Sequence, residues 1–235
     1  MSVVYLVRHA QASFLSDDYD RLSARGLAQA ERLGLAWQQQ GLHLDRVVAG
    51  PRRRQRDTAV EVLRAQDAER APALEVLDAF DEYPADEVLA GFADEMRGEP
   101  ELAQHLEDVM SASVEPRRRG RALDLLMRHA LLLWAAGRTP PGVPSWEDFV
   151  GRVRGAFDGL LRATASGRSV ALFSSAGTLG VVVGTVLGTD ARRSLELGWM
   201  LNNASVSEVQ FSGSRVGLVR YNTVGHLPSA EWTRR

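Results

Sequence analysis

The chain lacks two residue types altogether. Its 235 residues include no cysteine, which excludes disulfide bonds, thiolate catalysis and thiolate metal ligands. Lysine is also absent, so all 28 of its Lys and Arg side chains are arginine. Genome-wide codon usage explains such a bias better than one fold does, and this weakens any argument from arginine clusters. The arginine runs at 52–56 and 117–121 also lack the interleaved aromatics that stack on bases, so we expect no nucleic-acid surface.

Long hydrophobic runs are missing as well. No apolar stretch approaches the roughly 20 residues of a membrane-spanning helix, and the first residues lack the basic region of a signal peptide. The formal net charge of −2 creates no strong field toward nucleic acid or membranes. With 45% hydrophobic and 25% charged residues, the composition is typical of a globular protein. We therefore expect a cytoplasmic protein without membrane or nucleic-acid partners. The oligomeric state is unknown from the sequence.

Strand and helix patterns alternate along most of the chain. An apolar run at 3–7 predicts a first strand, and a helical pattern follows it at about 27–40. A strand at 45–49, a helix at 53–65 and a strand at 74–77 are predicted next. After the middle of the chain, we predict a helix at 145–161, a strand at 169–173, a helix at 176–188 and a hairpin at 206–221. This order predicts an α/β fold, a three-layer α/β/α sandwich with a mainly parallel central sheet.

The alternation stops in the middle of the chain. The segment from about 78 to 144 is rich in acidic residues and then contains a helical pattern at about 119–136, before Pro140-Pro141-Gly142. We interpret it as a helical insertion that caps the sheet, within a single domain spanning residues 1–235. Its acidic run is expected to be a solvated helix face. Ser145 is the predicted N-cap of the helix that resumes the α/β pattern.

Charged side chains follow two of the predicted strands directly. Arg8 and His9 end the first strand, and four arginines within 52–56 follow the second. Ligands bind at the carboxyl ends of strands in open α/β sheets. A neutral histidine can act as a nucleophile, arginine binds phosphate through paired hydrogen bonds, and a helix N-terminus adds to an anion site. The pattern predicts phosphoryl transfer to His9.

Three ordered motifs then give the chain a family resemblance. They are Arg8-His9-Ala10, the segment Leu22-Ser23-Ala24-Arg25-Gly26-Leu27-Ala28-Gln29-Ala30, and a third motif from Pro51 that places Arg54 four residues before Thr58-Ala59. In this order they resemble the histidine phosphatase superfamily, the phosphoglycerate-mutase-like proteins. The resemblance implies that His9 carries the phosphoryl group while Arg8 and Arg54 bind its oxygens. It implies no metal and no cofactor.

The chain departs from that family at two places. The family's second histidine follows its fourth strand, and Ser175 stands there in this sequence. The serine hydroxyl and the backbone amides of 175–178 are then the expected phosphate donors. The family's acid position holds Ala79, so Asp81 or Glu82 would have to protonate the leaving group, with Glu82 slightly preferred and Asp78 a weaker choice. Gln11 and Ser13 are candidate neutral phosphate donors, or simple turn residues.

The remaining histidines are expected to be outside the chemistry. A second Arg128-His129-Ala130 occurs inside a helical pattern, and we interpret it as coincidence. His226 follows the last strand and is expected to be structural. His43 and His105 have no second ligand at metal spacing, so no metal site is predicted.

The sequence thus predicts a metal-independent phosphomonoesterase that works through a phosphohistidine on a small phosphorylated substrate. A mutase is less expected, because nothing predicts the extra basic side chains that would retain a bisphosphorylated intermediate. The alternative is a catalytically degenerate relative that binds a phosphorylated ligand or partner without turnover. The natural substrate is not identified by the sequence.

Overall fold

The computed structural model describes residues 1–13, 20–67 and 71–234 of the chain. These residues divide into two compact units, the first comprising residues 1–82 and 152–235 and the second residues 83–151. The second unit includes most of the segment that the sequence marks as an insertion at about 78–144, but it begins at Tyr83 and extends to Gly151. The description of the whole chain as one domain stays a prediction.

The first unit is built on a six-stranded sheet with the strand order β3-β2-β4-β1-β5-β6. The strands are β1 (Ser2–Arg8), β2 (Arg46–Ala49), β3 (Leu74–Val76), β4 (Ser169–Ser174), β5 (Val206–Ser212) and β6 (Arg215–Thr223). β4 pairs in parallel with β1 and β2, and β2 pairs in parallel with β3. β5 and β6 form the antiparallel hairpin at the other edge. The mainly parallel sheet predicted from the sequence is confirmed.

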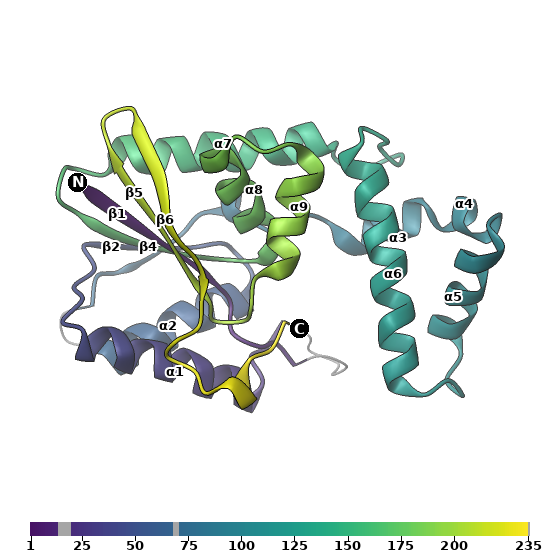
Figure 1. Ribbon diagram of the computed structural model, residues 1–235, viewed down its shortest axis with the longest axis horizontal. Helices are drawn as coiled ribbons and strands as arrows, with labels where there is room; N and C mark the ends of the chain where they lie inside the picture. The colour runs from purple at the N-terminus through teal and green to yellow at the C-terminus, as the bar shows by residue number, and fades with distance from the viewer. Residues whose placement is uncertain (14–19, 68–70, 235) are drawn as a thin grey trace. The chain divides into compact units, whose positions relative to one another are not determined.

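Helices cover both faces of this sheet. Figure 1 shows α1 (Ala24–Gln39) and α2 (Arg53–Asp67) on one face, and α7 (Trp146–Ala163), α8 (Ala176–Leu187) and α9 (Ala191–Met200) on the other. Two short 3-10 helices complete the unit, η1 (Asp78–Phe80) and η2 (Ser229–Glu231). Buried apolar side chains of β1, β2, β4, α1 and α2 form one core, which includes Val7, Leu33, Trp37, Val47, Val62 and Phe173. Burial of these side chains is what holds the α1–α2 layer on the sheet.

Two helix starts follow directly from local sequence. Ser23 caps α1, its side chain accepting a hydrogen bond from the Gly26 N–H. The Ser145 hydroxyl accepts from the Asp148 N–H at 3.0 Å, while the Asp148 carboxylate accepts from the Ser145 N–H at 3.2 Å. Each pair satisfies N–H groups that the first helical turn leaves without partners. The predicted cap at Ser145 is confirmed.

The second unit is helical. It contains α3 (Ala85–Gly91), α4 (Ala93–Arg97), α5 (Pro100–Met110) and α6 (Pro116–Ala135), in agreement with the helical character predicted for this segment. The aromatic rings of Tyr83, Trp134, Trp146 and Phe149 pack together there, with centroids 5.2–5.9 Å apart. The buried Trp134 indole N–H donates to the Pro144 carbonyl at 2.9 Å. Across the described parts of the chain, no helix has both the length and the hydropathy needed to cross a bilayer.

Candidate active site

His9 lies buried at the carboxyl end of β1, in the middle of the sheet. Its Nδ1 is 2.8 Å from the Ala10 carbonyl oxygen, and since a carbonyl only accepts, Nδ1 carries the proton. Burial, with the nearby Arg54 and Arg8 guanidinium groups, lowers the pKa of His9 well below 6.5. The ring is therefore neutral near pH 7, and Nε2 keeps its lone pair. These are the protonation state and tautomer that a nucleophilic imidazole needs.

Arg54 approaches this lone pair from the first turn of α2. Its Nε donates to His9 Nε2 at 3.2 Å, and its Nη1 donates to the Asp20 carboxylate at 2.6 Å. The same carboxylate accepts from the Arg53 backbone N–H at 2.7 Å. The Asp20 carboxylate group thus lies at the N-terminus of α2, beside the predicted phosphate-binding arginine. The sequence did not single out Asp20, because the contact joins residues 34 positions apart.

Arg8 is buried next to His9 and is already held by backbone oxygens. Its Nη1 donates to the Leu201 carbonyl, and its Nη2 donates to the Arg234 carbonyl at 2.8 Å. The Arg8 charge therefore stays close to the His9 ring, whose pKa it helps to lower. A direct contact between Arg8 and a phosphoryl oxygen stays a prediction.

Ser175 lies at the start of α8 and is 1% exposed. Ser175 and His9 follow neighbouring positions of the sheet, because Arg8 pairs with Ser174 and the His9 N–H donates to the Ser174 carbonyl at 2.9 Å. The Ser175 hydroxyl accepts a hydrogen bond from Gln55 Nε2 at 2.8 Å. Gln55 is not among the site residues predicted from the sequence, although it directly follows Arg54 in the third motif.

Both candidate acids lie in the turn after η1. The Asp81 carboxylate accepts from Arg52 Nε at 2.6 Å and from the Glu82 N–H at 2.7 Å. The Glu82 carboxylate accepts from the Gly177 N–H at 2.9 Å, at the N-terminus of α8. One of the amides expected to bind phosphate is thus engaged by Glu82. A helix N-terminus stabilises an anion, so this contact favours the carboxylate form of Glu82 over the protonated form that a general acid needs.

The two predicted neutral donors lie in the loop after β1. The Gln11 carboxamide oxygen accepts from the Ser23 hydroxyl at 3.0 Å, and the Ser13 N–H donates to the Arg21 carbonyl at 2.8 Å. These bonds tie the loop to the start of α1. Phosphate binding by Gln11 or Ser13 stays a prediction.

Two other histidines occupy different settings. His226 is largely buried, and burial lowers its pKa to about 4, while a hydrogen bond to the Ala204 backbone acts in the opposite direction. The Ala204 N–H in turn donates to the carbonyl of Arg8, the last residue of β1, at 3.1 Å. His129 lies within α6 of the second unit, as expected for a coincidental Arg-His-Ala.

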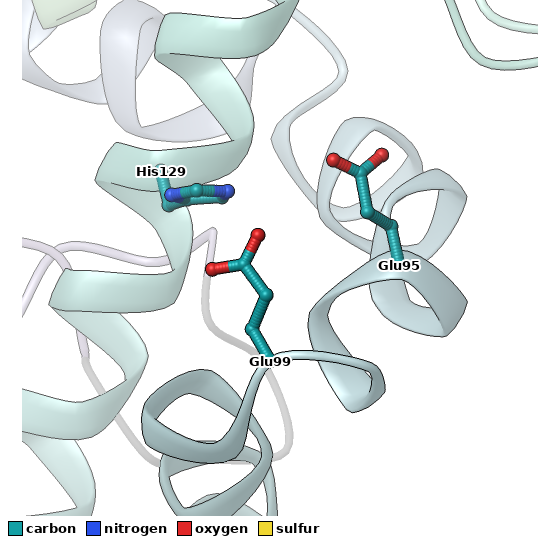
Figure 2. Close-up of side chains that lie close together, drawn as sticks. All are labelled: Glu95, Glu99 and His129. Carbon is teal, nitrogen blue, oxygen red and sulfur yellow. The ribbon is translucent and has the colours of Figure 1, made fainter.

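Figure 2 shows His129 with Glu95 and Glu99, whose potential ligand atoms all lie within 4.8 Å of one another. Such a set can hold a divalent cation. Both oxygens of Glu95, however, accept from Arg138, at 2.9 and 2.6 Å, and both glutamates are exposed. The pairing of Glu95 with Arg138 accounts for its position without a cation, and we assign no metal to this group.

Comparison with known proteins decides the family. The model of the histidine phosphatase superfamily (branch 1) matches residues 4–117 and 126–224. The chain belongs to this superfamily. The match includes His9, Arg54 and Ser175 and most of the second unit. A search of curated protein sequences found no match.

Solved structures of this superfamily share the fold at low sequence identity. A phosphoglycerate mutase from Bacillus anthracis is 17% identical, with a TM-score of 0.66, covering 96% of this chain and 94% of its own. A mycobacterial glucosyl-3-phosphoglycerate phosphatase is 19% identical, with a TM-score of 0.62 and coverage of 94% and 98%. A phosphoserine phosphatase mutant from Entamoeba histolytica, in complex with phosphoserine, is 13% identical, with a TM-score of 0.60 and coverage of 97% and 100%. At such identities the likeness establishes the fold, and these relatives include both phosphatases and a mutase.

Proposed function

We propose that this histidine phosphatase superfamily member is a phosphomonoesterase that forms a phosphohistidine at His9. The observation that carries the proposal is the His9 ring, buried and neutral, with Nδ1 bound to the Ala10 carbonyl and Nε2 facing Arg54. A ring fixed in this tautomer needs no proton transfer before it attacks. A small phosphorylated substrate suits the site, and the solved relatives include proteins named for phosphoserine and glucosyl-3-phosphoglycerate.

The proposed reaction has two steps. The His9 Nε2 lone pair attacks phosphorus while the bond to the ester oxygen breaks, and a donated proton completes the leaving alcohol. Water then attacks the phosphohistidine and gives a proton back to the group that protonated the leaving alcohol, while the N–P bond breaks to release inorganic phosphate and restore the neutral ring. Arg54 would exchange its 3.2 Å contact with His9 Nε2 for a phosphoryl oxygen, where a guanidinium stabilises the charge that develops. Neither step calls for a metal or an organic cofactor.

The chain contains two Arg-His-Ala segments, one with His9 and one with His129, and a comparison of the two histidines provides the test. We would compare turnover of p-nitrophenyl phosphate in EDTA for wild type, His9→Ala and His129→Ala. The expected result is a loss of more than about 10³-fold for His9→Ala, no change for His129→Ala, and an acid-labile phosphate on His9 of wild type after rapid quenching. Equal turnover by His9→Ala and wild type would contradict the proposal.

Glu82 is the better candidate for the proton donor, because Asp81 is bound to the Arg52 guanidinium. In this role Glu82 must take a proton when substrate displaces its contact with the Gly177 N–H. Alkoxides need protonation far more than nitrophenolate does. Glu82→Gln is therefore expected to lower turnover of an alkyl phosphate about 10²–10⁴-fold and that of p-nitrophenyl phosphate much less. Equal losses on both substrates would assign the acid elsewhere.

The alternative function is binding of a phosphorylated ligand without turnover. Two observations favour it: Ser175 replaces the family's second histidine, and the Glu82 carboxylate rests on a helix N-terminus, where its anionic form is stabilised. A protein of this kind would bind vanadate or phosphate at the His9 site yet hydrolyse neither aryl nor alkyl esters. The same assay, accompanied by calorimetry with vanadate, separates the two functions.

A further inference from the structure

We propose that Gln55 is a positioning residue that fixes the Ser175 hydroxyl as a donor to a phosphoryl oxygen. The pair Gln55–Ser175 would then supply the hydrogen bond that a second imidazole supplies elsewhere in the superfamily. This inference rests on the proposed function, because it assigns a role within the same phosphate site. It concerns two side chains that are 0% and 1% exposed and whose polar atoms lie 2.8 Å apart.

The direction of this hydrogen bond is fixed by a second contact. The Gln55 carboxamide oxygen, Oε1, is 3.1 Å from the backbone nitrogen of Arg52. A backbone N–H only donates, so the carboxamide must turn its oxygen toward Arg52 and its NH₂ group toward Ser175. Gln55 Nε2 therefore donates, and the Ser175 oxygen accepts. The hydroxyl proton of Ser175 has to point away from Gln55.

The surroundings of the carboxamide are built to hold it. Gly50, directly after β2, has no side chain and so leaves space for the Gln55 carboxamide. A Cβ at this position would lie 2.2 Å from Gln55 Oε1 and 2.5 Å from the Phe80 carbonyl oxygen. The Ser175 side chain makes no capping bond to the start of α8. A buried serine that does not cap its helix, and whose oxygen is already occupied by a donor, has its proton left for another acceptor.

The acceptor that we propose for this proton is a phosphoryl group bound at His9. Arg54 and Gln55 are consecutive residues of α2, and they contact the residues that follow two adjacent parallel strands, His9 after β1 and Ser175 after β4. A phosphoryl group on His9 would therefore have the Arg54 guanidinium and the Ser175 hydroxyl as neighbours. A hydroxyl whose rotation is already fixed loses less entropy when it binds than one that rotates freely.

The experiment is a set of double-mutant cycles between residues 55 and 175. Gln55→Met keeps the length of the side chain but removes the hydrogen bonds. Gln55→Glu keeps the acceptor for the Arg52 N–H but presents an oxygen to Ser175, which would draw the hydroxyl proton away from the phosphate. Each is made in wild type and in Ser175→Ala, and each is measured by kcat and KM for p-nitrophenyl phosphate and by vanadate affinity. Circular dichroism and thermal melts verify folding.

We expect Ser175→Ala to lower kcat/KM on the order of 10²-fold. Gln55→Met should lower it about threefold to tenfold in wild type and leave it unchanged in Ser175→Ala. Gln55→Glu should be worse than Gln55→Met in wild type. The negative charge that Gln55→Glu adds would by itself lower kcat/KM equally in wild type and in Ser175→Ala. The part of the Gln55→Glu loss that is present in wild type and absent in Ser175→Ala therefore measures the hydrogen bond to Ser175.

Equal losses in both backgrounds, or no loss in Gln55→Met, would overturn the inference and leave Gln55 a packing residue. Equal turnover by wild type and His9→Ala would instead contradict the proposed function, and the cycle in vanadate affinity would still decide the role of Gln55. Wild type that neither turns over the ester nor binds vanadate would overturn both.

Discussion

Three cationic side chains surround a histidine that the fold keeps uncharged. Burial is the largest cause of the lowered His9 pKa, followed by the Arg54 and Arg8 charges and, more weakly, by the Arg52 charge. The hydrogen bond to the Ala10 carbonyl acts in the opposite direction. A protonated ring would add a further positive charge to this cluster without water to screen it. The arginines that attract a phosphoryl group therefore also keep the nucleophile's lone pair available.

Removal of Arg54 should separate these two effects. Arg54→Met is expected to weaken inorganic phosphate binding by about 1.5–3 kcal/mol, the range for a charge-assisted hydrogen bond, as measured by calorimetry. It also removes a cation that lowers the His9 pKa, so that pKa should rise, which NMR titration of the ring would detect. Arg56, exposed on the same helix, is the matched control: Arg56→Met should change neither quantity. Unchanged phosphate affinity in Arg54→Met would contradict the assigned anion site.

At the residue scale, the sequence predicted the side chains that stand in local motifs. His9 and Arg54 are both identified by what flanks them, and the structure brings them into contact. Gln55 and Asp20 were not predicted, because each contacts a residue far along the chain. Gln55 contacts Ser175, 120 positions away, and Asp20 contacts Arg54, 34 positions away. Such contacts are set by the packing of whole elements, which no local pattern encodes.

At the element scale, α8 and α9 approach each other closely at two glycines. A Cβ on Gly180 would lie 2.5 Å from the Ser194 carbonyl oxygen, and one on Gly198 would lie 2.5 Å from the Ala176 carbonyl oxygen. The second contact fixes the start of α8, where Ser175 lies. The alternation of strands and helices predicted α8 but not α9, whose ten residues occupy a segment left unassigned between 188 and 206.

Gly180→Ala tests this packing. The new methyl group cannot be accommodated without moving the α9 backbone, so we expect a loss of about 1–3 kcal/mol in the free energy of unfolding, measured by urea denaturation. Gly155, in α7, has nothing within 4 Å of an added Cβ and is exposed. Gly155→Ala should instead stabilise the protein by about 0.5–1 kcal/mol, because alanine favours the helix. Similar effects of the two substitutions would show that the close α8–α9 approach is not required.

At the scale of the whole molecule, the sheet explains why distant motifs converge. β1, β2 and β4 are parallel neighbours, so their carboxyl ends deliver His9, the first turn of α2 and Ser175 to one edge. The alternating pattern predicted the mainly parallel sheet, since parallel neighbours require crossovers, but it did not predict the order of the strands. The three motifs in order also identified the superfamily. The extent of the second unit was harder to predict, because its boundary at Tyr83 depends on an aromatic cluster assembled from both ends of the segment.

The buried imidazoles also make the stability of the molecule depend on pH. Both His9 and His226 have a pKa lowered by burial, that of His226 to about 4. In the unfolded chain a histidine binds a proton near pH 6.5. Below that pH the unfolded state therefore holds more protons than the native state, and the free energy of unfolding falls as the pH decreases. Above about pH 6.5 the two rings are neutral in the folded and in the unfolded chain, so they no longer make the free energy of unfolding depend on pH.

His226→Gln isolates one part of this effect, since glutamine stays neutral at every pH. A pKa that falls from 6.5 to about 4 corresponds to a loss of about 3 kcal/mol at most as the pH is lowered through this interval. Between about pH 7 and pH 4.5, we expect the free energy of unfolding, measured by urea denaturation, to fall less in His226→Gln than in wild type, by up to about this amount. His43 is exposed, its ring hydrated whether the chain is folded or not, so His43→Gln should retain the full slope of wild type. An identical pH dependence in wild type and His226→Gln would mean that the His226 ring takes up its proton without unfolding the structure around Ala204.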